Sequence, residues 1–201
     1  MKIEGIFKNL ELIGYEVLFE SSDLPLDGNG AKEKFFENLD EEIDFLIFSE
    51  HLKRTEKLKG IRFVNLKPST LIKYAGKILE MLDGRTVIEL REDYASEEEI
   101  KEIEKIRKKF PFLLSIDDFG KQASNFDRIL LLKPNFVKIE INFFDRKTLW
   151  YLANLIRTHK IKLIAEKVET ERDFKMIKSF GFDFWQGYFS KKLEVPFPLK
   201  N

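Results

Sequence analysis

A chain of 201 residues is long enough for one domain with a sizeable core and too short for two of ordinary size, so we expect a single domain over residues 1–201. Its 35 basic and 35 acidic side chains cancel, so no net field draws the whole molecule toward a nucleic acid polymer or a membrane, and neither is an expected partner. Cysteine is absent and no stretch approaches the ~20 apolar residues of a membrane helix, which excludes disulfides and thiolate ligands and favours a soluble, cytoplasmic protein.

The amino-terminal part of the chain predicts a hairpin, a loop and a helix. Two apolar segments, Ile3–Phe7 and Leu12–Phe19, flank a turn-like Lys-Asn pair, which is typical of two antiparallel strands. Segment Ser21–Gly30 is rich in Asp, Gly and Pro and predicts a loop. Residues Ala31–Arg54 predict a helix, although the run Ile43–Phe48 within them is ambiguous between helix and strand.

From about residue 60 onward, short apolar runs alternate with amphipathic stretches, which is typical of repeated βα units over a parallel sheet. The six strands predicted here are Ile61–Leu66, Thr86–Leu90, Phe112–Ile116, Phe136–Ile141, Lys162–Val168 and Asp183–Tyr188. Between them, Glu97–Lys109 and the stretch around Leu149–Ile156 each place apolar residues on one face of a helix.

Eight strands with helical crossovers in about 200 residues predict an α/β fold of the TIM-like (β/α)8 barrel type, at the lower limit of its usual size. An open doubly wound sheet is the alternative. The sequence contains no G-x-G-x-x-G or G-x-x-x-x-G-K phosphate loop that would favour such a sheet.

Polar residues recur at or near the ends of the predicted strands. They are Glu16, Asn65, Glu89, Asp117, Asp118, Lys138, Glu166, Glu169 and Gln186. In a barrel, the carboxyl ends of the strands converge on one face, so residues far apart in sequence become neighbours. Clustered carboxylates repel one another, and divalent cations with a preference for oxygen, such as Mg²⁺ or Mn²⁺, are the usual compensation. The pattern therefore predicts a metal-dependent barrel enzyme, in which Asp117 is suited to bridge two ions that clamp a phosphodiester.

Each of these residues also has a simpler explanation when taken singly. A glutamate near a strand end is commonly a solvated loop charge, and Lys138 fits a surface lysine of an edge strand. Asp117 and Asp118 fit a helix N-cap and its neighbour, and Gln186 with the following glycine fits a turn. The common position of all of them at strand ends favours a shared site.

Several short motifs occur in a fixed order along the chain. Residues 14–18 read G-Y-E-V-L, residues 115–120 read S-I-D-D-F-G, residues 137–140 read V-K-I-E, residues 165–170 read A-E-K-V-E-T and residues 186–188 read Q-G-Y. Over residues 3 to about 193 the chain resembles the EAL domain family of cyclic-di-GMP phosphodiesterases in motifs and in their order. Val17, Glu140 and Lys167 stand where the family has alanine, aspartate and glycine.

The resemblance implies a barrel whose first strand is antiparallel and which hydrolyses cyclic-di-GMP to linear pGpG with two Mg²⁺ or Mn²⁺ ions. By motif position, one metal would be held by Glu16, Asn65, Glu89 and Asp117, and the other by Asp117, Asp118 and Glu166. Lys138 would lie beside the attacking water and form the catalytic set with Glu16 and Glu166. Leu18, Glu169 and Gln186 would bind substrate or orient ligands, and Glu92 would anchor the loop after D-D-F-G.

Two further departures from the family keep other functions open. Glu20 stands where the family has an arginine that contacts phosphate, and residues 121–126 read K-Q-A-S-N-F where the family usually has T-G-Y-S-S-L. One alternative is a non-catalytic module that binds cyclic-di-GMP or a signalling-protein partner. Another is a phosphodiesterase for a different phosphate ester. The resemblance also implies a homodimer that uses the barrel face near the loop after D-D-F-G.

Overall fold

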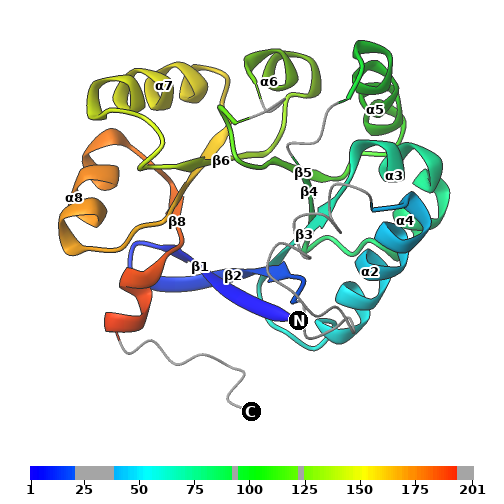
Figure 1. Ribbon diagram of the computed structural model, residues 1–201, viewed down its shortest axis with the longest axis horizontal. Helices are drawn as coiled ribbons and strands as arrows, with labels where there is room; N and C mark the ends of the chain where they lie inside the picture. The colour runs from blue at the N-terminus through cyan, green and yellow to red at the C-terminus, as the bar shows by residue number, and fades with distance from the viewer. Residues whose placement is uncertain (21–38, 92–94, 122–124, 194–201) are drawn as a thin grey trace.

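The structure is a computed structural model that describes residues 1–20, 39–91, 95–121 and 125–193. Eight strands form a closed barrel in the order of the chain (Figure 1). They are β1 (Lys2–Lys8), β2 (Glu11–Leu18), β3 (Ile61–Leu66), β4 (Thr86–Leu90), β5 (Leu113–Ile116), β6 (Phe136–Glu140), β7 (Lys162–Glu166) and β8 (Phe184–Trp185). Strand β1 is antiparallel to both of its neighbours and the other pairs are parallel, which confirms the predicted TIM-like barrel.

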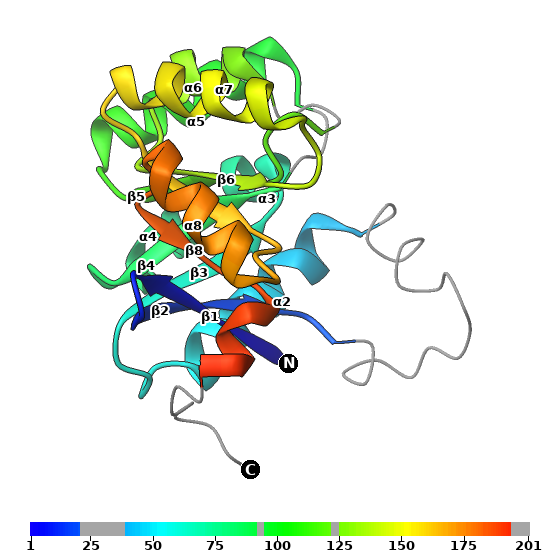
Figure 2. The same ribbon diagram turned by 90° about the vertical axis from the view of Figure 1, so that its left-hand side faces the viewer.

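Helices surround the barrel, and α5, α6 and α7 lie on the opposite side from the β1–β2 hairpin (Figures 1 and 2). The helices are α2 (Glu41–Arg54), α3 (Pro68–Lys73), α4 (Ala75–Met81), α5 (Glu97–Lys109), α6 (Phe126–Leu132), α7 (Arg146–Thr158), α8 (Glu171–Phe180) and the 3-10 helix η2 (Tyr188–Leu193). Side-chain caps define where several of them begin, because they satisfy the first free backbone N–H groups. Ser96 and Thr170 form capping boxes at α5 and α8, and Asp145 caps α7.

The interior of the barrel has two layers. The lower interior is apolar and lies toward the amino-terminal ends of the parallel strands, and the upper interior is polar and lies at their carboxyl ends. Successive side chains point to opposite faces of a strand, so residues two apart share a face. The lower interior is formed by the buried side chains of Ile6, Phe63, Val87, Phe136, Ile164 and Phe184. Two positions further along five of these strands stand Asn65, Glu89, Lys138, Glu166 and Gln186. The apolar layer therefore forms a floor beneath the polar residues.

The alternate residues of the strands point outward and pack on the helices. Val64, Leu66, Ile88 and Leu90 belong to one buried cluster that also contains apolar residues of α2, α3, α4 and α5. A second cluster joins outward residues of β6 and β7 to α7 and α8. These two clusters fix the helices against the barrel and hold the strand ends in register.

Some element boundaries differ from the predicted ones, for reasons visible in the backbone. Helix α2 begins after the extended cap Asp40 rather than near residue 31, and its Ile43–Phe48 run is helical. Strand β7 ends at Glu166 because Lys167 has a left-handed φ of 55°. Strand β8 ends at Trp185, two residues before Gly187 with φ 146°, so the predicted strand to Tyr188 is too long. The predicted loop Ser21–Gly30 and residues 31–38 lie outside the described residues.

Within the described ranges, none of the helices has the length and apolar character needed to cross a membrane.

Candidate active site

Lys138 lies at the centre of the upper barrel interior and is surrounded by carboxylates. Its side chain projects from β6 and has no solvent exposure. Its Nζ atom lies 3.0 Å from Glu16, 2.9 Å from Glu89, 3.2 Å from Asp117 and 3.0 Å from Glu166. These partners come from β2, β4, the end of β5 and β7, so one ammonium group joins four separate parts of the barrel.

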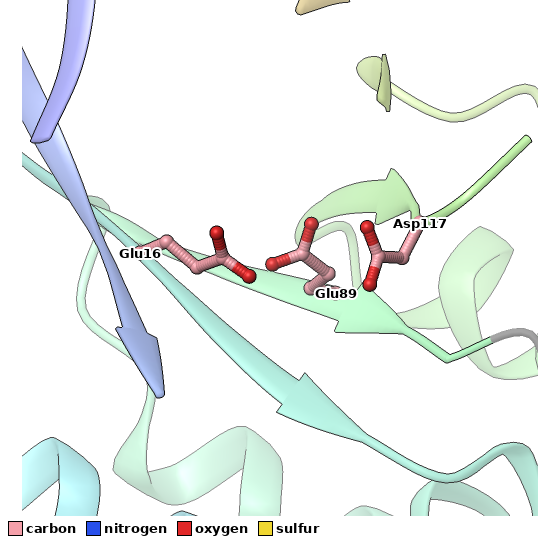
Figure 3. Close-up of side chains that lie close together, drawn as sticks. All are labelled: Glu16, Glu89 and Asp117. Carbon is pink, nitrogen blue, oxygen red and sulfur yellow. The ribbon is translucent and has the colours of Figure 1, made fainter. Parts of the chain in front are cut away.

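The carboxylates form two groups that share one residue. Oxygen atoms of Glu16, Glu89 and Asp117 all lie within 4.8 Å of one another, and the three side chains point toward a common space (Figure 3). Oxygen atoms of Asp117, Asp118 and Glu166 meet the same limit. Asp117 is therefore the residue common to both groups, as the sequence predicts for a bridging ligand.

Gln186 connects the two groups from the side of β8. Its buried amide donates one hydrogen bond of 2.5 Å to Glu16 and another of 3.1 Å to Glu166. Both of these carboxylates also pair with Lys138, so each is oriented by an amide and an ammonium group. This geometry supports the expected ligand-orienting role of Gln186.

Burial and mutual repulsion change the protonation of the cluster. Burial is the main cause that raises the pKa of Asp117 to about 6 and that of Glu166 to about 8, with like charges nearby adding to both shifts and Lys138 opposing them. Burial likewise raises the pKa of Glu89. For Lys138, burial lowers the pKa, but the four carboxylates outweigh this effect and raise it above its ordinary value.

These shifts predict that the metal-free domain loses stability as the pH rises from 5 to 9. Folded Asp117 and Glu166 keep protons that the unfolded chain has released above about pH 4.5, so this stabilisation is lost as the pH passes their folded pKa values of about 6 and 8. We expect the melting temperature, measured by calorimetry with a chelator, to fall by roughly 4 °C or more. Glu166→Gln cannot ionise and should show a smaller fall. An identical pH slope in this variant would contradict the prediction.

The residues present fit divalent cations. Oε1 of Glu89 lies 2.9 Å from the Lys138 ammonium, whereas within the described part of the chain no hydrogen-bond donor reaches its other oxygen, Oε2, although both atoms are buried. Formally, the five carboxylates and Lys138 leave four negative charges, which two divalent cations would neutralise. The atoms available to coordinate a metal are all oxygens, which suits hard cations such as Mg²⁺, Mn²⁺ or Ca²⁺.

Four of the predicted site residues lie beside the cluster or outside the described ranges. Asn65 pairs in register with Glu89, so it stands on the neighbouring strand at the same level. Leu18 is half-buried at the end of β2, and Glu169 is exposed after β7. Glu92 is not among the described residues. The substrate roles of Leu18 and Glu169 and the anchoring role of Glu92 stay predictions.

The structure also brings a group of residues to this site that the strand-end pattern did not predict. Lys121 contacts Asp118 and Glu140, and Lys167 contacts Glu140. The sequence offered one indication of this group: Lys121, Glu140 and Lys167 each differ from the residue that the family motif has at that position. The sequence alone did not show that the three side chains would meet.

The fold and site together define a β/α-barrel protein with a carboxylate-lined site at the carboxyl ends of its strands. The chain belongs to the EAL domain family, whose model matches residues 7–192. This match confirms the resemblance identified from the motifs.

Similar proteins include two curated relatives and many solved structures. The Escherichia coli K12 protein named "Probable cyclic di-GMP phosphodiesterase PdeA" is 29% identical over 65% of this chain and 20% of its own length. Cyclic di-GMP phosphodiesterase CdgJ of Vibrio cholerae is 27% identical over 91% of this chain and 41% of its own length. The chain thus spans less than half of either relative. The Bacillus subtilis YkuI protein, with an EAL domain in complex with cyclic-di-GMP and calcium, superposes over 99% of this chain and 56% of its own with TM-score 0.74 and 22% identity.

Proposed function

We propose that this protein hydrolyses cyclic-di-GMP to linear pGpG in a reaction that depends on divalent metal ions. The observation that carries the proposal is the pair of carboxylate groups that share Asp117 around the buried Lys138. Family membership and the names of the two relatives supply the substrate. We further propose that residues 1–201 act as one domain in the cytoplasm.

The proposed metal ligands follow the two groups. Glu16, Glu89 and Asp117, with Asn65 beside them, would hold one Mg²⁺ or Mn²⁺ ion. Asp117, Asp118 and Glu166 would hold the second. When bound, such ions lower the pKa of a water molecule and neutralise charge on the phosphate.

Lys138 is the proposed stabiliser of charge in the reaction. Water adds to one phosphodiester phosphorus, the bond from that phosphorus to one ribose oxygen breaks, and the departing oxygen takes up a proton. Negative charge grows on the phosphate oxygens during this step. The Lys138 ammonium has no solvent exposure and is held by four carboxylates, and a fixed positive charge has a larger effect in such a buried position than in water.

Neighbouring residues would keep this group in place. Glu16 and Glu166 complete the proposed catalytic set because both contact Lys138, and Gln186 holds both of them. Below them, Phe63, Phe136 and the other apolar side chains of the barrel floor exclude water from that side. Leu18 and Glu169 are proposed to contact the nucleotide from the ends of β2 and β7.

The non-catalytic alternative is less favoured because every predicted carboxylate of the two groups is present and clustered. Buried like charges are costly to keep without a cation to hold. A second copy of the chain and a signalling-protein partner stay proposals that follow from the family resemblance.

The test of this function is an assay of the purified chain with cyclic-di-GMP and either Mg²⁺ or Mn²⁺, with the products separated by chromatography. We expect linear pGpG only when a divalent ion is present. A different phosphate ester, such as a linear dinucleotide, serves as the comparison substrate. Binding of cyclic-di-GMP without any product would favour the non-catalytic alternative.

Glu20 is expected to weaken substrate binding. It follows β2, its side chain is 47% exposed, and one carboxylate oxygen lies 3.5 Å from the amino group of Met1. The family places a phosphate-contacting arginine at this position. Glu20→Arg would remove a repulsion and add a charge-assisted contact, so the affinity for cyclic-di-GMP should rise at least ~10-fold, or ~1.4 kcal/mol.

Titration calorimetry with Ca²⁺ in place of Mg²⁺ is the measurement for Glu20→Arg. The gain should shrink as salt screens the charges. Glu102→Arg makes the same charge change on α5, where Glu102 pairs with Lys105, and should leave the affinity unchanged. Equal affinities of wild type and Glu20→Arg at low salt would mean that Glu20 does not face the substrate.

A further inference from the structure

A row of alternating charges leads from Asp118 to the edge of the site. The Lys121 Nζ atom lies 2.7 Å from Oδ1 of Asp118 and also contacts Oε2 of Glu140. The other oxygen of Glu140, Oε1, lies 2.8 Å from Nζ of Lys167. The order along this row is therefore Asp118, Lys121, Glu140 and Lys167.

The row is built from three separate strand ends. Asp118 and Lys121 follow β5, Glu140 ends β6 and Lys167 follows β7, and Glu140 pairs in register with Glu166. Glu140 and Lys121 are only 14% and 28% exposed, whereas Lys167 is 59% exposed. The contacts are thus partly shielded from water close to the cluster, where charges act more strongly than on an open surface.

Lys167 places a lysine side chain beside Glu140 at a left-handed backbone position where the family has glycine. Lys167 has φ 55°, a conformation that costs a lysine more than a glycine. Residues held in such a conformation are stabilised by their surroundings and are common at functional sites. Here Lys167, which replaces the family's glycine, places its positive charge beside one carboxylate oxygen of Glu140.

Lys121 contacts one carboxylate oxygen of Asp118, which is a residue of the second proposed metal group. Asp118 belongs to the group with Asp117 and Glu166, and its Oδ1 atom is already at hydrogen-bond distance from an ammonium group. A divalent cation that binds Asp118 would be repelled by this ammonium or would have to displace it. Glu140 offers the displaced ammonium a second carboxylate that it already contacts.

We propose that Lys121 is an internal cation that competes with a divalent ion for Asp118, and that Glu140 sets the strength of this competition by holding the same ammonium. The inference rests on the proposed metal sites. Lys138 contacts all three carboxylates of the Glu16, Glu89 and Asp117 group and two of the other group, whereas Lys121, among the contacts of the described residues, reaches only Asp118 of the Asp117, Asp118 and Glu166 group. Removal of Lys121 should therefore tighten metal binding at the group with Asp118 and leave the group with Glu16 and Glu89 unchanged.

Titration of the chelator-treated full chain with Mn²⁺, with free Mn²⁺ measured by electron paramagnetic resonance, tests this without any turnover. Wild type should bind two Mn²⁺ ions. Lys121→Met should tighten the binding of one of them at least ~10-fold and leave the other unchanged, and Lys121→Gln should act in the same direction. Lys101→Met removes the same charge from an exposed pair with Glu97 on α5 and should change neither site more than about 2-fold.

A double-mutant cycle tests the part played by Glu140. Glu140→Gln leaves Asp118 as the carboxylate that Lys121 contacts among the described residues, and should weaken the group with Asp118 about 3-fold. In the Lys121→Met background the same change should have no such effect, whereas a general loss of negative charge would weaken binding equally in both backgrounds. An equal loss in the two backgrounds would remove Glu140 from the proposal.

The results also separate this inference from the proposed function. If wild type binds two Mn²⁺ ions and Lys121→Met and Lys121→Gln bind them with the same affinities, the competition by Lys121 is wrong and the metal sites stand. If neither wild type nor the variants bind Mn²⁺, both the metal sites and the competition are wrong. Mn²⁺ binding that appears only in the Lys121 variants would support the competition in its strongest form.

Discussion

Asp117→Asn is expected to lower the turnover of cyclic-di-GMP at least ~10³-fold, because Asp117 is the carboxylate common to both groups and also contacts Lys138. An asparagine keeps the size of the side chain and removes its charge. The same variant should lose the stabilisation by metal. Millimolar Mn²⁺ should raise the melting temperature of wild type by linkage, and should raise that of Asp117→Asn much less.

Turnover assays and thermal unfolding with and without Mn²⁺ measure the two effects of Asp117→Asn. Asp127→Asn is the matched control, since Asp127 is an exposed residue in the first turn of α6. It should keep both the turnover and the response to Mn²⁺. An Asp117→Asn protein that is as active as wild type, or that gains as much stability from Mn²⁺, would rule out the shared-ligand role.

The barrel could be predicted from the sequence because strand-like and helix-like segments alternate at regular intervals along the chain. Each apolar run carries a polar residue near its carboxyl end, as in Thr86–Leu90 with Glu89, and the six later runs follow one another at intervals of one βα unit. Side-chain alternation then places Glu89 and Lys138 inside the barrel above Val87 and Phe136. The convergence of strand ends, rather than any single residue, predicts the cluster.

What the sequence could not predict are the contacts made by long, flexible side chains. The alternation of side chains along the strand predicts that Lys138 faces the barrel interior. Its simultaneous contacts with four carboxylates depend on the closure of the barrel. The meeting of Lys121 and Lys167 at Glu140 depends on the backbone after β5 and β7, including the left-handed φ of Lys167. Neither set of contacts produces a repeated pattern in the sequence.

The length of an individual strand also depends on contacts that the sequence pattern does not reveal. The apolar run Asp183–Tyr188 predicts a strand of six residues, whereas β8 is only Phe184–Trp185. The chain turns at Gly187, where the backbone nitrogen and oxygen of Val168 leave no space for a Cβ atom. This close approach depends on tertiary structure, and it places Gln186 where its amide reaches Glu16 and Glu166.

Lys138→Met is expected to destabilise the metal-free domain and to remove most of its activity. Methionine fills a similar volume but leaves four carboxylates without their shared cation, and removal of one partner from a buried ion cluster costs about 3–5 kcal/mol. The loss should be largest near pH 9, where Glu166 is ionised, and smaller at pH 5, where Asp117 and Glu166 take up protons instead.

Denaturant unfolding at pH 5 and pH 9 with a chelator measures the stability of Lys138→Met, and turnover in saturating Mn²⁺ measures its activity. Lys147→Met, at an exposed position of α7, is the control and should match wild type in both. Because two divalent ions would neutralise the same carboxylates, Mn²⁺ should restore much of the stability of Lys138→Met. Turnover should nevertheless stay at least ~10²-fold below wild type, since the fixed charge that stabilises the phosphate oxygens is gone. Full turnover in a refolded, Mn²⁺-loaded variant would assign Lys138 a structural role alone, whereas restored stability without turnover separates its two roles.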